Sequence, residues 1–159
     1  MTVGGRVVIA GLGNEYRRDD GVGPLVARRA AASAARPVEV LGPLSDPLEL
    51  LGRWDGASLA VVVDAVQSGS TPGTLRVVEL DPLAGDGDAR PATSTHGIDL
   101  VGVVRLAVAV DGAPRRVVVV GIEGRDFGRG VGLTPDVAAA VPAAVGRVVE
   151  LVEGCRPCA

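Results

Sequence analysis

Three residues with side chains suited to metal chemistry stand out in this chain: Asp20, Asp64 and His96. His96 is the only histidine, Asp20 follows a glycine-rich segment, and Asp64 comes directly after an apolar run. Two carboxylates and one imidazole form a mixed oxygen and nitrogen ligand set, which suits a borderline cation such as nickel or zinc. Because the three residues are far apart in the sequence, this hypothesis requires a fold that brings them together.

The order of strand and helix patterns provides such a fold. Short apolar and β-branched runs predict five strands, at residues 6–10, 38–41, 59–63, 74–80 and 116–122. Helical spacing predicts helices at residues 22–35, 46–51, 98–108 and 135–153, the last two capped by Ser94 and Thr134. This alternation predicts an α/β fold, a three-layer α/β/α sandwich around a mostly parallel, twisted sheet of about five strands. Strand 74–80 is expected at an edge of the sheet.

The predicted elements place the three candidates at one end of the sheet. In open α/β sheets, ligands bind beyond the carboxyl ends of the strands. Asp64 falls at the carboxyl end of a predicted strand, and Asp20 lies where the first helix begins. His96 falls in the first turn of a later helix. We therefore expect all three side chains to converge on the carboxyl edge of the sheet.

Each candidate also has a purely structural explanation. Asp19 and Asp20 are a charge pair that would stabilise a helix N-terminus by capping and by the helix dipole. Of the two, we expect Asp19 to have the structural role and Asp20 to face the cleft. A carboxylate such as Asp64 is costly to bury unless it is solvated, hydrogen-bonded or metal-bound. His96 alone could be a polar residue at a helix start.

Other chemistries fit the sequence less well. The Gly-Leu-Gly at residues 11–13 follows a strand, but the dinucleotide fingerprint requires glycine at position 16, which is Tyr16. Ser94 lies close to His96, yet the chain has no G-x-S-x-G segment for a serine hydrolase. The charged residues of the glycine-rich segment 124–132 are expected to be solvated rather than catalytic.

Composition excludes several partners and predicts one domain. The chain has 159 residues, of which 47% are apolar and 2% aromatic. We predict a single domain over residues 1–159, with an ordered core at about 5–153 and a flexible tail. The net charge is −3, from 16 basic and 19 acidic residues without a basic cluster, which argues against nucleic acid and anionic membranes.

The ends of the chain carry no signal that we assign to function. No signal-peptide pattern or apolar run of membrane-spanning length is present, so a cytoplasmic, soluble protein is expected. Cys155 and Cys158 form a Cys-x-x-Cys pair at the C-terminus. A single pair supplies only two thiolates, and we interpret it as part of a dispensable tail rather than as a redox or zinc site.

Six short segments, taken in order, resemble the signature of the nickel–iron hydrogenase maturation endopeptidases. They are Gly-Leu-Gly-Asn at 11–14, Asp-Asp-Gly-Val-Gly at 19–23, Val-Asp-Ala at 63–65, Pro-Gly-Thr at 72–74, Ser-Thr-His at 94–96 and Gly-Leu-Thr-Pro at 132–135. Each is weak alone, but the ordered set is specific and extends from about residue 6 to 153. Two features depart from the family: residues 41–45 lack the frequent Gly-Thr, and Gly97 replaces a frequent glutamine.

The resemblance implies both a site and a function. The metal-binding positions of the family carry over to Asp20, Asp64 and His96, the set already chosen for its chemistry. Proteases of this family remove a C-terminal extension from the precursor of the hydrogenase large subunit after nickel insertion, and the nickel of the substrate serves as the recognition element. The resemblance thus implies a peptidase with a large-subunit precursor as partner, nickel supplied by the substrate and no organic cofactor. A monomer is compatible with this function.

Two other functions stay open at this stage. One is a metal-sensing maturation chaperone that binds the precursor without hydrolysis. The other is an esterase like the bacterial peptidyl-tRNA hydrolases, which share the Gly-Leu-Gly-Asn opening but carry a histidine soon after the asparagine and a basic face for RNA. Within the peptidase hypothesis, either the metal activates water or a carboxylate acts as general base.

Overall fold

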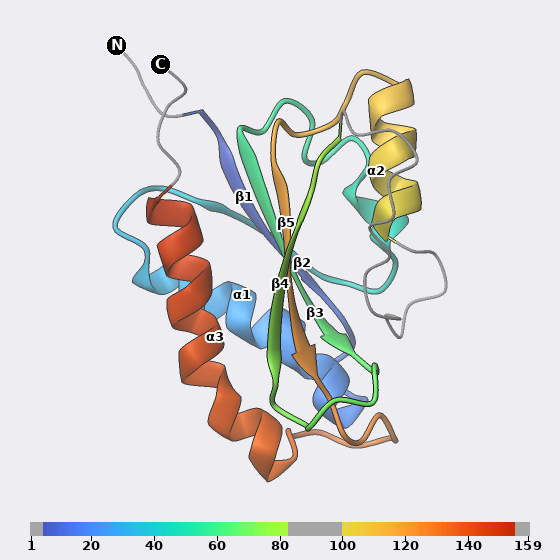
Figure 1. Cartoon of the computed structure of the whole chain (residues 1–159), viewed down its shortest axis with the longest axis vertical. Coiled ribbons are helices and arrows are strands. Elements are labelled where there is room, and N and C mark those ends of the chain that lie inside the picture. Colours follow the sequence, from blue (N-terminus) through green and yellow to red (C-terminus); the bar gives the residue numbers. More distant parts are fainter. Residues whose placement is uncertain (1–4, 83–99, 155–159) are drawn as a thin grey trace.

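A five-stranded sheet with helices on both faces forms the centre of the computed structural model, which describes residues 5–82 and 100–154 (Figure 1). The strands are β1 (Val7–Leu12), β2 (Glu39–Leu44), β3 (Leu59–Val66), β4 (Leu75–Leu80) and β5 (Val117–Glu123). The α-helices are α1 (Val22–Ser33), α2 (Leu100–Ala109) and α3 (Pro135–Glu153). Two short 3₁₀ helices, η1 (Arg18–Gly21) and η2 (Pro47–Leu50), precede α1 and follow β2. The predicted three-layer α/β architecture is confirmed.

The sheet has the strand order β2-β1-β3-β5-β4. All neighbouring strands are parallel except β4, which pairs with β5 in the antiparallel direction at one edge. The connection from Val66 to Leu75 contains no helix, whereas a parallel neighbour would require a long crossover. The chain therefore reverses, and β4 occupies the edge predicted for it.

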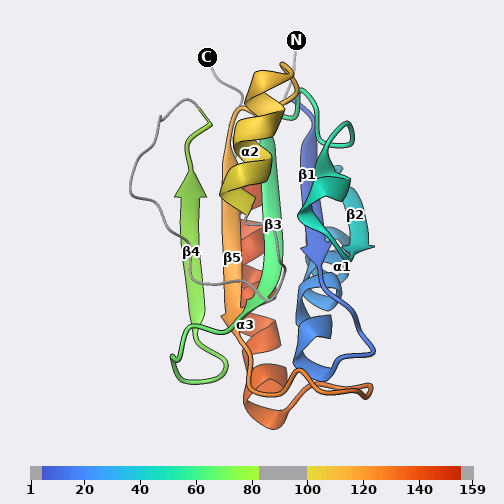
Figure 2. The same ribbon diagram turned by 90° about the vertical axis from the view of Figure 1, so that its right-hand side faces the viewer.

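Each face of the sheet has its own hydrophobic core. Successive side chains of a strand point to opposite faces, and this determines the face from which Asp64 projects. Helices α1 and α3 cover one face, against Val61 and Val63 of β3, while α2 covers the other, against Val62 (Figure 2). Every residue of β1, β3 and β5 is buried, as expected for parallel strands covered on both sides. Because successive side chains alternate, Asp64 projects from the same face as Val62, the α2 face.

Two predicted details differ from the structure, and a third is not tested by it. Strand β3 continues through Ala65 to Val66, so Asp64 lies inside the strand rather than at its end, because both following residues pair with β5. The helical segment predicted at residues 46–51 is only the short 3₁₀ helix η2. The predicted cap Ser94 lies outside the described residues.

Of the helices in the described ranges, none has the length and apolarity needed to cross a bilayer.

Candidate active site

Two glycines bring the start of α1 against the carboxyl ends of β1 and β3. Gly13 follows β1 directly with a φ of +137°, and a Cβ atom there would overlap the carbonyl oxygen of Asp20. Gly23 lies in the first turn of α1, where a Cβ atom would overlap the carbonyl oxygens of Leu12 and Val63. Only glycine permits such close backbone approaches. The chain before α1 is thereby held on the edge of the sheet, and Asp20 with it.

Asp20 is oriented by the turn that follows β1. Its side chain is buried, and its Oδ2 atom accepts a hydrogen bond from the backbone N–H of Asn14 at 2.8 Å. The side-chain carbonyl of Asn14 in turn accepts the N–H of Tyr16 at 2.9 Å. Asn14, the only asparagine of the chain, therefore contacts both the Asp20 carboxylate and the backbone of the loop at residues 14–17.

Asp64 reaches the same edge from the middle of the sheet. Its side chain is 3% exposed, and Asp64 pairs with Gly121 on the neighbouring strand β5. Strand β3 and η1 are in contact. The structure thus brings Asp20 and Asp64, two buried carboxylates from different elements, to the carboxyl edge predicted for them.

His96 lies outside the described residues, so its place in the ligand set stays a prediction. Helix α2 begins at Leu100, four residues after His96, and packs on the face from which Asp64 projects. Within residues 5–82 and 100–154 there is no group of three or more His, Cys, Asp or Glu side chains arranged to hold a metal. The three-residue site therefore requires His96.

Asp19 has the structural role expected for it. Its side chain is fully buried, and its Oδ1 accepts the backbone N–H of Thr134 at 2.7 Å. Its Oδ2 accepts the N–H groups of Arg125 (2.8 Å) and Asp126 (3.0 Å) and the hydroxyl of Thr134 (2.8 Å). Asp19 thereby joins η1 to the loop between β5 and α3.

These contacts also set the charge state of Asp19. Burial raises the pKa of its carboxyl, but the hydrogen bonds from Asp126, Thr134 and Arg125 lower it by more, so the pKa lies below the ordinary value of 3.8. Thr134 occupies the N-cap position of α3 as predicted. Its hydroxyl, however, donates to Asp19 instead of capping its own helix.

Glu123 is a further buried acid at this end of the sheet and is not among the candidates chosen from the sequence. It ends β5, is 4% exposed and accepts the N–H of Ser68 at 3.0 Å and the Ser68 hydroxyl at 2.5 Å. It lies two residues after Gly121, the partner of Asp64, and so projects from the same face of the sheet. An acid at the end of an apolar strand is the signal that identified Asp64, and it would have identified Glu123 as well.

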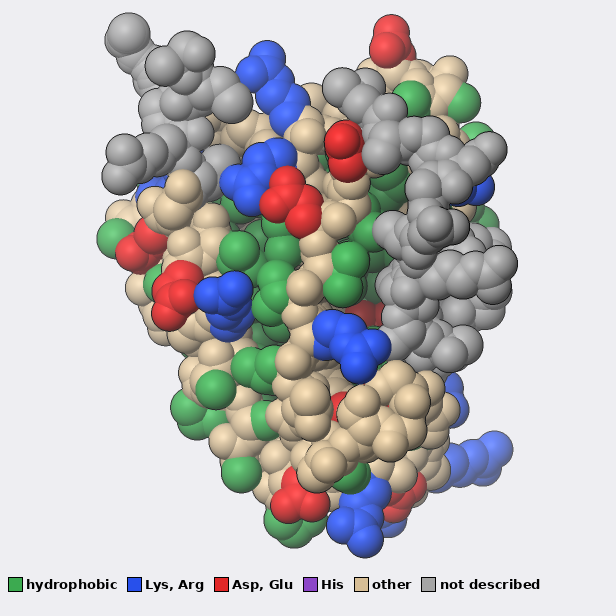
Figure 3. Space-filling view, in the orientation of Figure 1, with side chains coloured by type: hydrophobic (Ala, Val, Ile, Leu, Met, Phe, Trp, Pro, Cys, Tyr) green, Lys and Arg blue, Asp and Glu red, His purple; other side chains and the backbone are tan. Residues whose placement is uncertain are grey.

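The loop at residues 124–134 covers this end of the molecule and is held against residues 16–19. Gly130 donates its N–H to the carbonyl of Tyr16 at 3.0 Å and accepts the N–H of Arg18 at 2.9 Å. Arg125 and Arg129 are exposed as predicted, whereas Asp126 is partly buried and forms an ion pair with Arg18 at 3.4 Å. Arginine and acidic side chains gather at this lower end of the molecule in Figure 3.

Comparisons with known proteins agree with this fold. The family model for hydrogenase maturation proteases matches residues 26–151. The chain is 31% identical over 149 residues to the hydrogenase expression/formation protein HupD of Rhodobacter capsulatus, covering 91% of this chain and 70% of the relative. The hydrogenase maturating endopeptidase HybD from E. coli has the same fold, with a TM-score of 0.78, 22% identity and coverage of 94% and 93%.

A second solved structure is more similar in sequence. It is the [NiFe] hydrogenase maturation protease HycI from Thermococcus kodakarensis KOD1, with a TM-score of 0.72, 27% identity and coverage of 93% of this chain and 92% of that one. The chain belongs to the hydrogenase maturation protease family. It is accordingly a peptidase whose general role is the processing of a hydrogenase large subunit.

Proposed function

We propose that this peptidase removes the C-terminal extension of a nickel-loaded [NiFe]-hydrogenase large-subunit precursor, and that Asp20, Asp64 and His96 contact the nickel of that substrate. The observation that carries the proposal is the pair of buried carboxylates, Asp20 and Asp64, which reach one edge of the sheet from η1 and β3. Family membership favours this peptidase over a non-hydrolytic maturation chaperone or a peptidyl-tRNA hydrolase-like esterase.

The donor chemistry of the site suits such a substrate. Carboxylate oxygens and an imidazole nitrogen together match a borderline divalent ion, and burial strengthens the attraction because little water screens it. The Asn14 N–H fixes the orientation of the Asp20 carboxylate, while the sheet fixes the backbone of Asp64. A metal ion in this position can polarise a carbonyl group or activate water. No organic cofactor is required by the proposal.

A carboxylate is also available for proton transfer. In the proposal, the substrate nickel positions the precursor tail, and Asp20 or Asp64 accepts a proton from the attacking water. An amide replacement distinguishes activation of water by the metal from general-base catalysis by a carboxylate. The side chain of Asp64→Asn still offers an oxygen ligand to the metal but can no longer accept a proton as a base. A variant that binds the nickel-loaded precursor normally yet fails to cleave it would therefore assign the base.

Intact-mass spectrometry of a nickel-loaded large-subunit precursor, with and without the purified protein, tests the proposal. We expect loss of a C-terminal fragment, and at least a hundredfold slower loss with Asp20→Asn, Asp64→Asn or His96→Ala. Asp111→Asn is the matched control, because Asp111 is exposed, lies after α2 and has a φ of +61°, which asparagine tolerates well.

Three outcomes would contradict parts of the proposal. Full cleavage by His96→Ala would remove His96 from the ligand set. Equal cleavage of nickel-free and nickel-loaded precursor would exclude recognition through nickel. A stable nickel-dependent complex with an intact tail would indicate the chaperone function instead.

A further inference from the structure

Two of the most exposed apolar side chains of the described residues lie beside the candidate site. Val131 is 75% exposed and Tyr16 is 65% exposed. The chain has only three aromatic residues, and the other two, Trp54 and Phe127, are buried and partly buried. The sole strongly exposed aromatic ring therefore lies four residues before Asp20.

The fold holds Tyr16 in this exposed position through its backbone. Its N–H donates to the Asn14 side chain at 2.9 Å, and its carbonyl accepts the N–H of Gly130 at 3.0 Å. Three residues further along, Asp19 accepts four hydrogen bonds from the loop between β5 and α3 and so holds the two segments together. Because the backbone of Tyr16 is held at both polar groups, binding through its ring requires little further ordering of the backbone, which makes Tyr16 a suitable anchor for a partner.

The charge of the two loops differs from that of the whole chain. Apart from the buried Asp19 and Asp20 that follow directly, residues 14–18 and 125–131 contain four arginines and two acidic residues, a local charge of +2, although the chain carries −3. Arg18 forms an ion pair with Asp126 at 3.4 Å and Arg125 with Asp136 at 3.7 Å. Among the described residues, none forms an ion pair with Arg17 or Arg129, and both are exposed. Their guanidinium groups are suited to a carboxylate of a partner.

We propose that Tyr16, Val131, Arg17 and Arg129 form a docking surface, here called the loop rim, for the polypeptide of the precursor. The segment bound there carries an apolar side chain close to a carboxylate. This inference rests on the proposed function and adds the surface that holds the substrate chain. Asn14 hydrogen-bonds both to the Tyr16 N–H and to the Asp20 carboxylate, so a segment anchored on the loop rim is placed in a defined position relative to Asp20.

The apolar half of the loop rim is tested by Tyr16→Ser and Val131→Ser. The matched control is Val110→Ser, since Val110 is also 65% exposed but lies between α2 and β5, before the amino end of that strand. With nickel-loaded precursor we expect the KM for tail removal to rise at least tenfold with Tyr16→Ser, with kcat changed less than twofold, and no change with Val110→Ser. If Tyr16→Ser and Val110→Ser have the same KM for tail removal, the proposal that the loop rim is a docking surface is wrong.

The result also separates this inference from the proposed function. If the wild-type protein cleaves the precursor and the rim variants do so equally well, the function stands and the loop rim fails. If the wild-type protein binds but does not cleave, the same variants are compared by the Kd for the precursor, and a tenfold rise with Tyr16→Ser supports the loop rim. If it neither binds nor cleaves, both proposals fail.

The charged half is tested by the double variant Arg17→Gln/Arg129→Gln. Its control is Arg53→Gln, because Arg53 is exposed and uses its backbone carbonyl in its contact with Arg6. We expect the double variant to raise KM at low ionic strength and to flatten the rise of KM with salt, because screening acts on exposed charge pairs. An unchanged salt dependence would exclude a carboxylate partner for the two arginines.

Discussion

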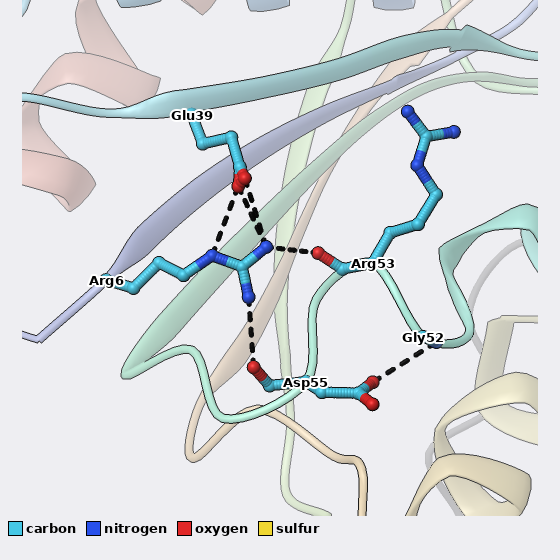
Figure 4. A network of polar contacts seen from close by, with 5 residues as sticks. All are labelled: Arg6, Glu39, Gly52, Arg53 and Asp55. Atoms are coloured by element: carbon cyan, nitrogen blue, oxygen red, sulfur yellow. Dashed lines mark hydrogen bonds and ion pairs between the residues drawn. The ribbon is translucent and has the colours of Figure 1, made fainter.

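The two ends of the central sheet hold their charged groups in opposite ways. At the carboxyl end, Asp19 is fully buried and accepts four hydrogen bonds from two other segments of the chain. At the amino end, Arg6 contacts the Glu39 carboxylate at 2.8 to 3.1 Å and the backbone carbonyls of Arg53 and Asp55 (Figure 4). The Arg6 and Glu39 side chains are 39% and 41% exposed.

This difference in burial, rather than the number of contacts, decides what each network contributes. Removing a buried partner leaves its donors without water to replace it, and each such group costs about 1–3 kcal/mol. An exposed ion pair exchanges its partner for water at little cost, usually about 0–1 kcal/mol. The carboxyl end should therefore be sensitive to single substitutions and the amino end tolerant of them.

Asp19→Ala is expected to have the largest effect of the substitutions considered. It would leave three backbone N–H groups and one hydroxyl without their acceptor, and we expect a loss of about 3–5 kcal/mol in the free energy of unfolding. Urea unfolding at neutral pH measures the loss. Thr134→Val is the control, since it removes only the hydroxyl donor and should cost about 1 kcal/mol. Equal effects of the two variants would contradict the central role given to Asp19.

Gly13→Ala should follow in magnitude. The φ of +137° disfavours alanine, and the added Cβ atom would overlap the Asp20 carbonyl, so we expect a loss of at least about 2 kcal/mol together with reduced cleavage. Gly69→Ala is the matched control, because Gly69 has a φ of +86° with open space around it. A cost for Gly13→Ala no greater than that for Gly69→Ala would show that the approach to Asp20 is not tight.

The pH dependence of stability provides a third, smaller test. Because the pKa of Asp19 is lower in the folded protein than its ordinary value of 3.8, its stabilisation is fully present above that value and is lost as the pH falls through the folded pKa. The difference in unfolding free energy between wild type and Asp19→Asn should therefore shrink between about pH 5 and pH 2. Urea unfolding across this range measures it.

Glu79 is the exposed counterpart for this test. Its hydrogen bond with Arg116 lowers its pKa, although burial opposes the shift, and the two side chains are 53% and 42% exposed. Glu79→Gln should therefore reduce the acid dependence by a smaller amount, and 0.5 M salt should remove most of that effect. A difference for Asp19→Asn that stays constant with pH would contradict a lowered pKa.

The same contrast explains what the sequence could predict. Strands β1, β3 and β5 appear as continuous apolar runs because both of their faces are buried. The order and direction of the strands and helices predict the end of the sheet at which Asp20 and Asp64 lie. The contact between Asp19 and Thr134 joins segments 115 residues apart. No local pattern encodes such a contact, and Thr134 has the sequence signature of an ordinary helix cap.

Local sequence patterns also gave a wrong position within the strand for Asp64 and did not single out Glu123. The apolar run predicts that β3 ends at Val63, because Asp64 interrupts it, yet Ala65 and Val66 also pair with β5 and extend the strand past Asp64. Glu123 carries the same signal as Asp64 but belongs to no segment of the family signature. Its contact with Ser68 depends on the loop after β3, which the sequence indicates only as a turn.

Arg6→Gln should have the smallest effect and completes the comparison of the two ends. Glutamine can keep one hydrogen bond to Glu39 or to a backbone carbonyl, and water can solvate the rest because the site is open. We expect a loss of about 1 kcal/mol or less in the unfolding free energy, reduced further in 0.5 M salt, and unchanged cleavage of the precursor. A loss as large as that of Asp19→Ala would mean that the number of contacts, and not their burial, determines the stability of this sheet.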